Sequence, residues 1–169
     1  MQQLRFCPKC GRETLKFEGQ KFTCSHCDYN YYHNIAAAVA VIIRNGEKVL
    51  LTRRNQDPKK GLLDLAGGFV DQGETAEQAC ARELHEELGL EVKQSRLKYL
   101  CSKPNTYFYK EILYYTLDLF FEYNLEGEEQ FSLATDEISE LVWLRREELK
   151  IEELAFESQE EFFKDYCPQ

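Results

Sequence analysis

The stretch that decides the fold is residues 68–90, which read GFVDQGETAEQACARELHEELGL. It places a glycine-rich loop ahead of three carboxylates, Glu83, Glu86 and Glu87, at positions i, i+3 and i+4 of a predicted helix. Such positions share one helix face, with Cβ atoms about 5–6 Å apart, so the like charges repel. A hard divalent cation such as Mg²⁺ or Mn²⁺ takes oxygen ligands and usually brings phosphate oxygens with it. The stretch therefore predicts a metal site that faces a phosphorylated substrate.

The length of 169 residues suits one domain of ordinary size with a small appendage, and a hydrophobic content of 43% is enough for a packed core. No window approaches the roughly 18 apolar residues of a membrane span, and residues 1–7 lack the core of a signal peptide. We therefore expect a cytoplasmic protein without a membrane partner. The net charge of −9 divides into +2 for residues 1–34 and −11 for the remainder. The acidic remainder of the chain disfavours nonspecific binding to nucleic acid, although residues 1–34 alone could contact a phosphate backbone.

Four of the seven cysteines form two C-x₂-C pairs, at Cys7, Cys10, Cys24 and Cys27. An odd cysteine count without a secretory signal indicates a reducing compartment, where paired cysteines more often hold metal than form disulfides. We therefore expect residues 1–34 to be a zinc ribbon with a closed, structural Zn²⁺ site. His26 and His33 are alternative ligands, but four thiolates already saturate a tetrahedral site. The other cysteines, Cys80, Cys101 and Cys167, are scattered, and Cys80 falls on an apolar helix stripe.

Residues 35–169 mix strand patterns with two or three helical patterns, which indicates an α+β domain layered as α/β/α around a mixed sheet. The continuous apolar run at residues 35–43 predicts a strand buried on both faces. Residues 75–88 predict a helix that stops at Gly89. The other expected elements are a hairpin turn at Asn45-Gly46, strands at 48–52, within 61–70 and near 98–102, 112–122 and 141–144, and a charged helical tail over 145–166.

The spacing G-x₅-E-x₇-R-E-L-x-E-E-x-G-L, from Gly68 to Leu90, resembles the signature of the Nudix hydrolases at every specified position. Nudix enzymes cleave the pyrophosphate bond of a nucleoside diphosphate linked to another group, using Mg²⁺ or Mn²⁺, and the resemblance implies this reaction and the Nudix sandwich fold. A surface helix with solubilising acids is the plain alternative. It does not explain why Gly68 and Glu74 precede the helix at this spacing.

The resemblance implies that Glu83 and Glu87 ligate the metal and that the Gly68 carbonyl completes the coordination. Glu86 would be a further ligand or a base that acts on water. The metal would neutralise pyrophosphate charge and lower the pKa of the attacking water.

Two further roles follow from the same resemblance. Arg82 would pair with Glu74 and hold the ligand carboxylates in orientation. An acidic residue before the last strand often reaches the metals in this family. We expect Glu137 to fill that role, with Asp136, Glu140 and an exposed acidic turn as alternatives.

The substrate is expected to be a nucleotide conjugate. A zinc ribbon ahead of a Nudix domain resembles the NADH pyrophosphatase group. That group carries S-Q-P-W-P-F-P-x-S after the Nudix signature, which spans Gly68 to Leu90 here and is called the box below. Residues 102–109 here read SKPNTYFY, so glutamine and tryptophan are replaced. We expect Arg53 and Arg54 to clamp phosphates, with Lys59 and Lys60 more simply read as a solvated loop. Tyr107, Phe108 and Tyr109 would stack on a base, or else pack within a strand.

We therefore expect a dinucleotide or sugar nucleotide such as NADH, ADP-ribose or FAD. The alternatives are a house-cleaning pyrophosphatase for nucleoside triphosphates, a nucleotide-sensing or nucleic-acid-binding module that uses the ribbon, and an enzyme for capped RNA ends. Relatives with this arrangement are commonly homodimers, so the resemblance also implies a homodimer.

Overall fold

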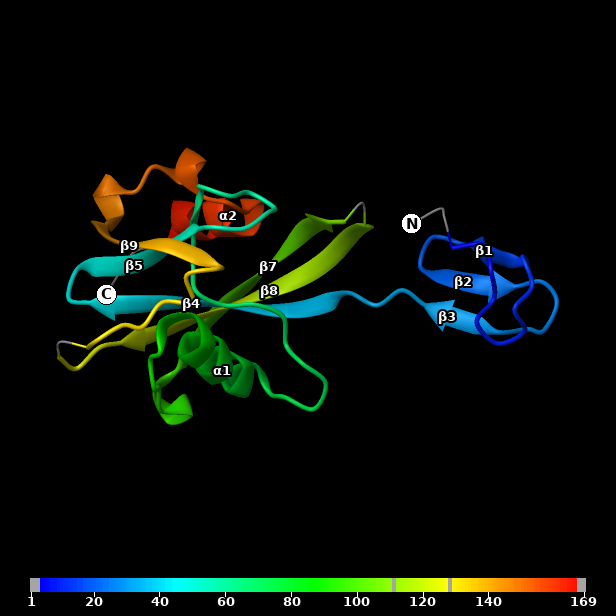
Figure 1. Cartoon of the computed structure of the whole chain (residues 1–169), viewed down its shortest axis with the longest axis horizontal. Coiled ribbons are helices and arrows are strands. Elements are labelled where there is room, and N and C mark those ends of the chain that lie inside the picture. Colours follow the sequence, from blue (N-terminus) through cyan, green and yellow to red (C-terminus); the bar gives the residue numbers. More distant parts are fainter. Residues whose placement is uncertain (1–3, 111, 128, 167–169) are drawn as a thin grey trace.

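The computed structural model describes residues 4–110, 112–127 and 129–166. Cys167, one of the three cysteines outside the C-x₂-C pairs, lies outside these described residues. The described strands form two sheets (Figure 1). A small sheet belongs to the N-terminal residues, and a larger sheet belongs to the remainder of the chain. The extended segment between Tyr32 and Ala36 joins them. Within the described residues, no helix is long and apolar enough to cross a membrane.

The N-terminal sheet is antiparallel, with the order β1-β2-β3. Its strands are β1 (Leu15–Phe17), β2 (Lys21–Cys24) and β3 (Asn30–Tyr32). Phe22 is its main buried apolar side chain, and the ring of Phe17 packs against it with centroids 4.8 Å apart. So little apolar burial leaves most of the stability of this unit to other interactions.

The larger sheet is mixed, as expected. Its strands are β4 (Ala36–Asn45), β5 (Lys48–Arg54), β6 (Leu63–Asp64), β7 (Lys98–Tyr109), β8 (Ile112–Asn124) and β9 (Ile138–Arg145). They follow the order β6-β5-β4-β8-β7, and β9 pairs with β5. Strands β4 and β8 are parallel, with Ala36 opposite Thr116, and the other pairs are antiparallel.

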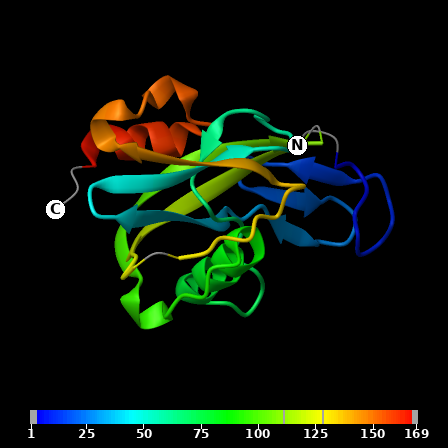
Figure 2. The same cartoon turned by 60° about the vertical axis from the view of Figure 1, so that its left-hand side comes forward.

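One helix covers each face of this sheet (Figures 1 and 2). Helix α1 (Ala76–Leu88) packs with the side chains of Val39, Val41 and Ile43, whereas α2 (Glu157–Asp165) packs with those of Ala40 and Ile42. Alternate side chains of β4 therefore enter opposite cores, which confirms the prediction of a strand buried on both faces and the α/β/α layering.

The ends of α1 follow from its local sequence. Thr75 forms a capping box with Gln78, because the Thr75 hydroxyl accepts from the Gln78 N–H at 3.2 Å and the Gln78 carboxamide accepts from the Thr75 N–H at 2.8 Å. Gly89 ends the helix in the left-handed conformation, with φ of 65°. The predicted helix limits were therefore correct to within one residue.

Two predicted elements were wrong in extent. The strand expected near residues 98–102 continues to Tyr109, because β7 lies at the edge of the sheet and tolerates Pro104 there. The helical tail expected over 145–166 is broken into two 3₁₀ turns, Arg146–Glu148 and Ile151–Glu153, followed by α2. The break arises because the Ala155 N–H donates to the carbonyl of Leu63 in β6 at 2.8 Å, which a continuous helix would prevent.

Candidate active site

The glycine loop is held between β4 and α1. The Val39 N–H donates to the Gly68 carbonyl at 2.8 Å, and the Val41 N–H donates to the Ala66 carbonyl at 2.9 Å. A Cβ atom at Gly67 would lie 2.1 Å from the Val39 carbonyl oxygen, and one at Gly68 would lie 2.5 Å from Glu83 Oε1. Gly67 therefore requires glycine, because the Val39 backbone leaves no room for a side chain, whereas a side chain at Gly68 would displace the Glu83 carboxylate.

Arg82 organises the acidic face of α1. Its guanidinium donates to both oxygens of Glu74, at 2.8 and 3.0 Å, and to the Phe69 carbonyl at 3.0 Å. Its Nη1 also donates to Glu83 at 2.8 Å and to Glu86 at 3.0 Å. This planar fork fixes two carboxylates of the box relative to the loop, a geometry that a lysine ammonium cannot reproduce. The structure thus pairs Arg82 with Glu74, in the arrangement expected from the sequence.

The ionisation of these acids follows from their surroundings. Burial raises the pKa of Glu83, and burial together with the charges of Asp64 and Glu83 raises the pKa of Glu87 well above its ordinary value. The hydrogen bonds from Arg82 instead lower the pKa of Glu74. Glu74 is therefore a stable anion beside Arg82, whereas no Lys, Arg or His among the described residues forms an ion pair with Glu87.

These residues have the chemistry of a divalent-metal site. Glu83, Glu86 and Glu87 offer oxygen atoms, and a cation would relieve the repulsion that opposes ionisation of Glu87. The Gly68 carbonyl accepts one hydrogen bond, from Val39, and keeps a second lone pair for a ligand. Among the described residues, the carboxylates of Glu83 and Glu86 accept hydrogen bonds from Arg82, and the carboxylate of Glu87 accepts one from the Gly67 N–H at 3.1 Å. The donor set fits Mg²⁺ or Mn²⁺, and the assignment of ligands stays a prediction.

A cavity of about 380 Å³ extends from the box across the end of the sheet. Box residues Gly68, Arg82, Glu83, Glu86 and Glu87 form part of its lining. The other lining residues come from five strands (β4 to β8), from α2 and from the connecting loops, and include Asp64, Asn105, Tyr107, Thr116, Asp118, Phe156 and Gln159. The cavity therefore brings the carboxylates of the box together with aromatic rings and amides.

The structure separates the three acids considered near the last strand. Glu137 lines the cavity, where one of its carboxylate oxygens accepts from the Gln56 amide at 2.9 Å. Glu140 instead pairs with Arg53 at 2.8 Å, and neither Glu140 nor Asp136 lines the cavity. Glu137 is thus the acid of the three that the fold brings to the box.

The predicted substrate-binding residues do not all line the cavity. Arg54 and Tyr107 line the cavity, but Arg53, Phe108 and Tyr109 do not. The side chain of Phe108 is 59% exposed, and Arg53 is committed to Glu140 and the Gly61 carbonyl. Arg54 is held by Asp64 at 2.6 Å and by the Pro58 carbonyl at 2.8 Å. Their roles in binding stay predictions.

Several cavity residues escaped sequence analysis. Asp64 and Asp118 are each 8% exposed, and Gln159 is 4% exposed. An acid inside an apolar strand pattern, such as Asp64 between Leu63 and Leu65, was the available signal, because a buried carboxylate requires partners. Gln159 gave no such signal, since it lies in a charged stretch that resembles a solvated helix.

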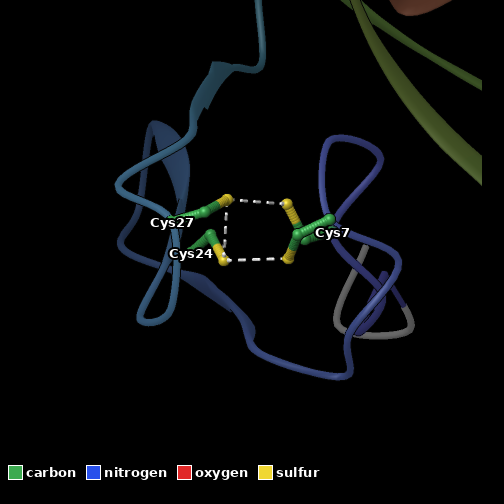
Figure 3. Close-up of side chains that lie close together, drawn as sticks. Cys7, Cys24 and Cys27 are labelled. Atoms are coloured by element: carbon green, nitrogen blue, oxygen red, sulfur yellow. Dashed lines mark hydrogen bonds between the residues drawn. The ribbon is translucent and has the colours of Figure 1, made fainter.

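The four paired cysteines converge at one point of the N-terminal unit. Their sulfur atoms all lie within 4.8 Å of one another, and Figure 3 shows Cys24 and Cys27 facing Cys7. The separations of 3.7 Å (Cys7–Cys27), 3.8 Å (Cys10–Cys24) and 3.5 Å (Cys24–Cys27) match the edge of about 3.8 Å of a tetrahedron with Zn–S bonds of about 2.3 Å. The Thr14 hydroxyl lowers the pKa of Cys24 to about 6, which favours a thiolate, whereas burial raises the pKa of the neighbouring Cys27 to about 12. The cluster fits a zinc site.

A family model named NUDIX domain matches residues 34–166. The chain therefore belongs to the Nudix family, and its α/β/α sandwich is the Nudix fold.

Individual relatives indicate a group within this family. The chain is 38% identical over 103 residues to an NAD-capped RNA hydrolase NudC of Haemophilus influenzae, covering 59% of this chain and 38% of that one. It is 40% identical over 104 residues to the NudC of Edwardsiella ictaluri, with coverage of 61% and 39%. These matches confirm the resemblance to the NADH pyrophosphatase-like group, although they span well under half the length of those relatives.

Two solved structures show the same fold. A NUDIX hydrolase from Nitrosomonas europaea aligns with a TM-score of 0.68 at 23% identity, covering 96% of this chain and 92% of that one. The NUDIX domain of Shewanella oneidensis NrtR, in complex with ADP ribose, aligns with a TM-score of 0.61 at 20% identity, with coverage of 79% and 86%.

Proposed function

We propose that this chain is a metal-dependent pyrophosphohydrolase that cleaves a nucleoside diphosphate linked to a second group. A dinucleotide or sugar nucleotide such as NADH, ADP-ribose or FAD is the favoured substrate. The observation that carries the proposal is one cavity lined both by Glu83, Glu86 and Glu87 and by Tyr107 and amide side chains. Such a cavity suits a substrate with phosphates beside the carboxylates and a base beside the aromatic rings. The similarity to NudC proteins supports the same class.

Each residue of the site has a separate proposed role. Glu83 and Glu87 would hold Mg²⁺ or Mn²⁺, with Glu137, which lines the same cavity, as a further ligand. The bound cation would neutralise phosphate charge and lower the pKa of the attacking water. Arg82 keeps the box acids aligned through Glu74 and the Phe69 carbonyl. Glu86 is 56% exposed, and an oxygen that is free of Arg82 would accept a proton from water or bind a further cation.

A second substrate class is favoured by one observation, the similarity to proteins named NAD-capped RNA hydrolases. The same pyrophosphate bond occurs in such caps, and residues 1–34 carry a mild positive charge that an RNA backbone would attract. The acidic body would confine that contact to the ribbon. A short NAD-capped RNA therefore belongs beside the free nucleotides in the test.

The test is a hydrolysis screen of the purified chain with Mg²⁺ or Mn²⁺ against NADH, ADP-ribose, FAD, NAD-capped RNA and nucleoside triphosphates. We expect Glu87→Gln to lower kcat/KM by about 100-fold or more, beyond the loss typical of groups that only orient ligands. Glu91→Gln is the matched control, because Glu91 lies just after α1, is 85% exposed and contacts His85 outside the cavity. Turnover of triphosphates alone would reject the dinucleotide assignment. Unchanged turnover by Glu87→Gln would reject the metal assignment.

A further inference from the structure

The wall of the cavity that holds Asp64 contains a buried acceptor without a donor. Gln159 lies in the first turn of α2, lines the cavity and is 4% exposed. Its Nε2 donates to Asp64 Oδ1 at 2.5 Å. Its Oε1 is buried and receives no hydrogen bond from any described residue. Buried polar atoms nearly always have a partner, so an unmatched one beside a cavity points to a ligand.

The orientation of this amide is fixed by its surroundings. Asp64 also accepts from the Arg54 guanidinium at 2.6 Å, so its carboxylate faces a cation and acts as an acceptor. Turning the Gln159 amide over would place its oxygen against that carboxylate, where two acceptors would repel. The nitrogen therefore faces Asp64, and the unmatched atom is the oxygen.

The neighbouring acceptors are already matched by protein donors. Asp118 accepts from Thr116 at 2.7 Å, from Asn105 at 2.8 Å and from Ser158 at 2.6 Å. This network orients Asn105, whose amide nitrogen faces Asp118 for the same reason that the Gln159 nitrogen faces Asp64. Gln159 Oε1 is thus the acceptor that a ligand donor would complete.

Aromatic rings stand beside this acceptor. The Tyr107 ring lies 5.8 Å from that of Phe156 and 5.7 Å from that of Phe69, and all three residues line the cavity. The Arg54 guanidinium lies over the Phe156 ring, 5.2 Å from its centroid, which helps to hold that ring in place. A planar heterocycle stacks favourably on such rings without a demand for one particular base.

We propose that Gln159 Oε1 accepts a hydrogen bond from an amino group on a planar ring that stacks beside Tyr107, making Gln159 a specificity-determining residue. This inference rests on the proposed function, since it names a group of the same substrate that the cavity recognises. Adenine and the carboxamide of nicotinamide both supply such an amino group. A ring with an oxygen in its place sets an acceptor against Gln159, and a carboxylate adds repulsion from Asp64 and Asp118.

The experiment measures binding by calorimetry in the presence of Mg²⁺, so it does not depend on turnover. One arm compares AMP with purine riboside 5′-monophosphate, which lacks the amino group. The other arm compares nicotinamide mononucleotide with nicotinic acid mononucleotide. We expect one arm to show a preference for the amino-bearing nucleotide of about tenfold or more, and that arm identifies the base.

The variant Gln159→Met has a similar volume without the acceptor, and it is expected to lose the preference. Glu161→Gln is the control, because Glu161 lies on the exposed side of the same helix and does not line the cavity. It should keep the preference. Equal affinities in both arms, or no binding of either amino-bearing nucleotide, would overturn the inference even if Gln159→Met failed to fold. A clear preference in a chain that hydrolyses nothing would reject the proposed function alone.

Discussion

Gly68 shows how one missing side chain shapes the acidic site. A Cβ atom there would lie 2.5 Å from Glu83 Oε1 and 2.8 Å from its carboxyl carbon, so alanine would push the carboxylate out of place. We expect Gly68→Ala to lower kcat/KM by about 10- to 100-fold, as for other changes that misalign metal ligands. Hydrolysis assays with Mn²⁺ titration measure the effect. Gly127→Ala is the control, because nothing lies within 4 Å of its Cβ position. Equal activity of both variants would contradict the argument.

Glu87 makes metal binding sensitive to pH. Burial and the charges of Asp64 and Glu83 raise its pKa well above its ordinary value of 4.5, so protons compete with the cation for this carboxylate. In the metal-free protein the contribution of Glu87 to stability is therefore full below that ordinary value and is lost as the pH rises through the raised pKa.

The same sign predicts how the cation acts. We expect Mn²⁺ to raise the melting temperature most at the alkaline end of the range tested, where a larger fraction of Glu87 is ionised, and progressively less as the pH falls. Thermal melts with and without Mn²⁺ across this range measure the difference. A melting-temperature gain that stays constant with pH would show that Glu87 does not bind the ion. In Glu87→Gln, we expect the gain to be smaller at alkaline pH and to vary less with pH.

At the scale of elements, α2 covers one face of the sheet and also carries Gln159 into the cavity. Phe163 is 1% exposed, and its neighbour Phe162 stacks on Phe120 with centroids 4.5 Å apart. We expect Phe163→Ala to lower the free energy of unfolding by about 3–5 kcal/mol, the range for an aromatic removed from a packed core. Urea denaturation measures it, and exposed Lys164→Ala should change stability by less than about 0.5 kcal/mol. A small loss for Phe163→Ala would mean that α2 is not firmly docked.

Elements set by local interactions were predictable from sequence, and those set by distant partners were not. Helix α1 carries its own capping box at Thr75 and its own stop at Gly89, so its limits can be read from the chain. The start of α2 depends on the hydrogen bond from Ala155 to Leu63, residues far apart in sequence. Periodicity alone could not reveal that contact, and it therefore predicted one long tail helix.

The same contrast between local and distant contacts explains which residues of the site could be predicted. The box residues lie on one loop and one helix, so their grouping follows from spacing. The aromatic run at 107–109 became part of β7, where successive side chains point to opposite faces. Tyr107 therefore lines the cavity while Phe108 is exposed. Arg53 and Arg54 are divided in the same way by β5, and no local pattern shows which of two neighbours faces the cavity.

At the scale of the whole molecule, the chain combines two units that are stabilised by different means. The sandwich has a core on each face of its sheet. The N-terminal unit has one fully buried aromatic ring, Phe22, and four converging cysteines. We infer that metal–thiolate bonds supply most of the folding free energy of the N-terminal unit, as in other small metal-dependent modules.

Removal of zinc should therefore unfold one unit and leave the other. We expect one Zn²⁺ per chain by elemental analysis, and rapid proteolysis within residues 4–34 after chelation, with the sandwich still resistant. Cys24→Ser should lose the zinc, because its sulfur lies 3.5 Å from that of Cys27 and 3.8 Å from that of Cys10. Cys101→Ser, which changes a cysteine of β7 outside the cluster, should retain it. Full zinc content in Cys24→Ser, or proteolysis of both units after chelation, would contradict this division of stability.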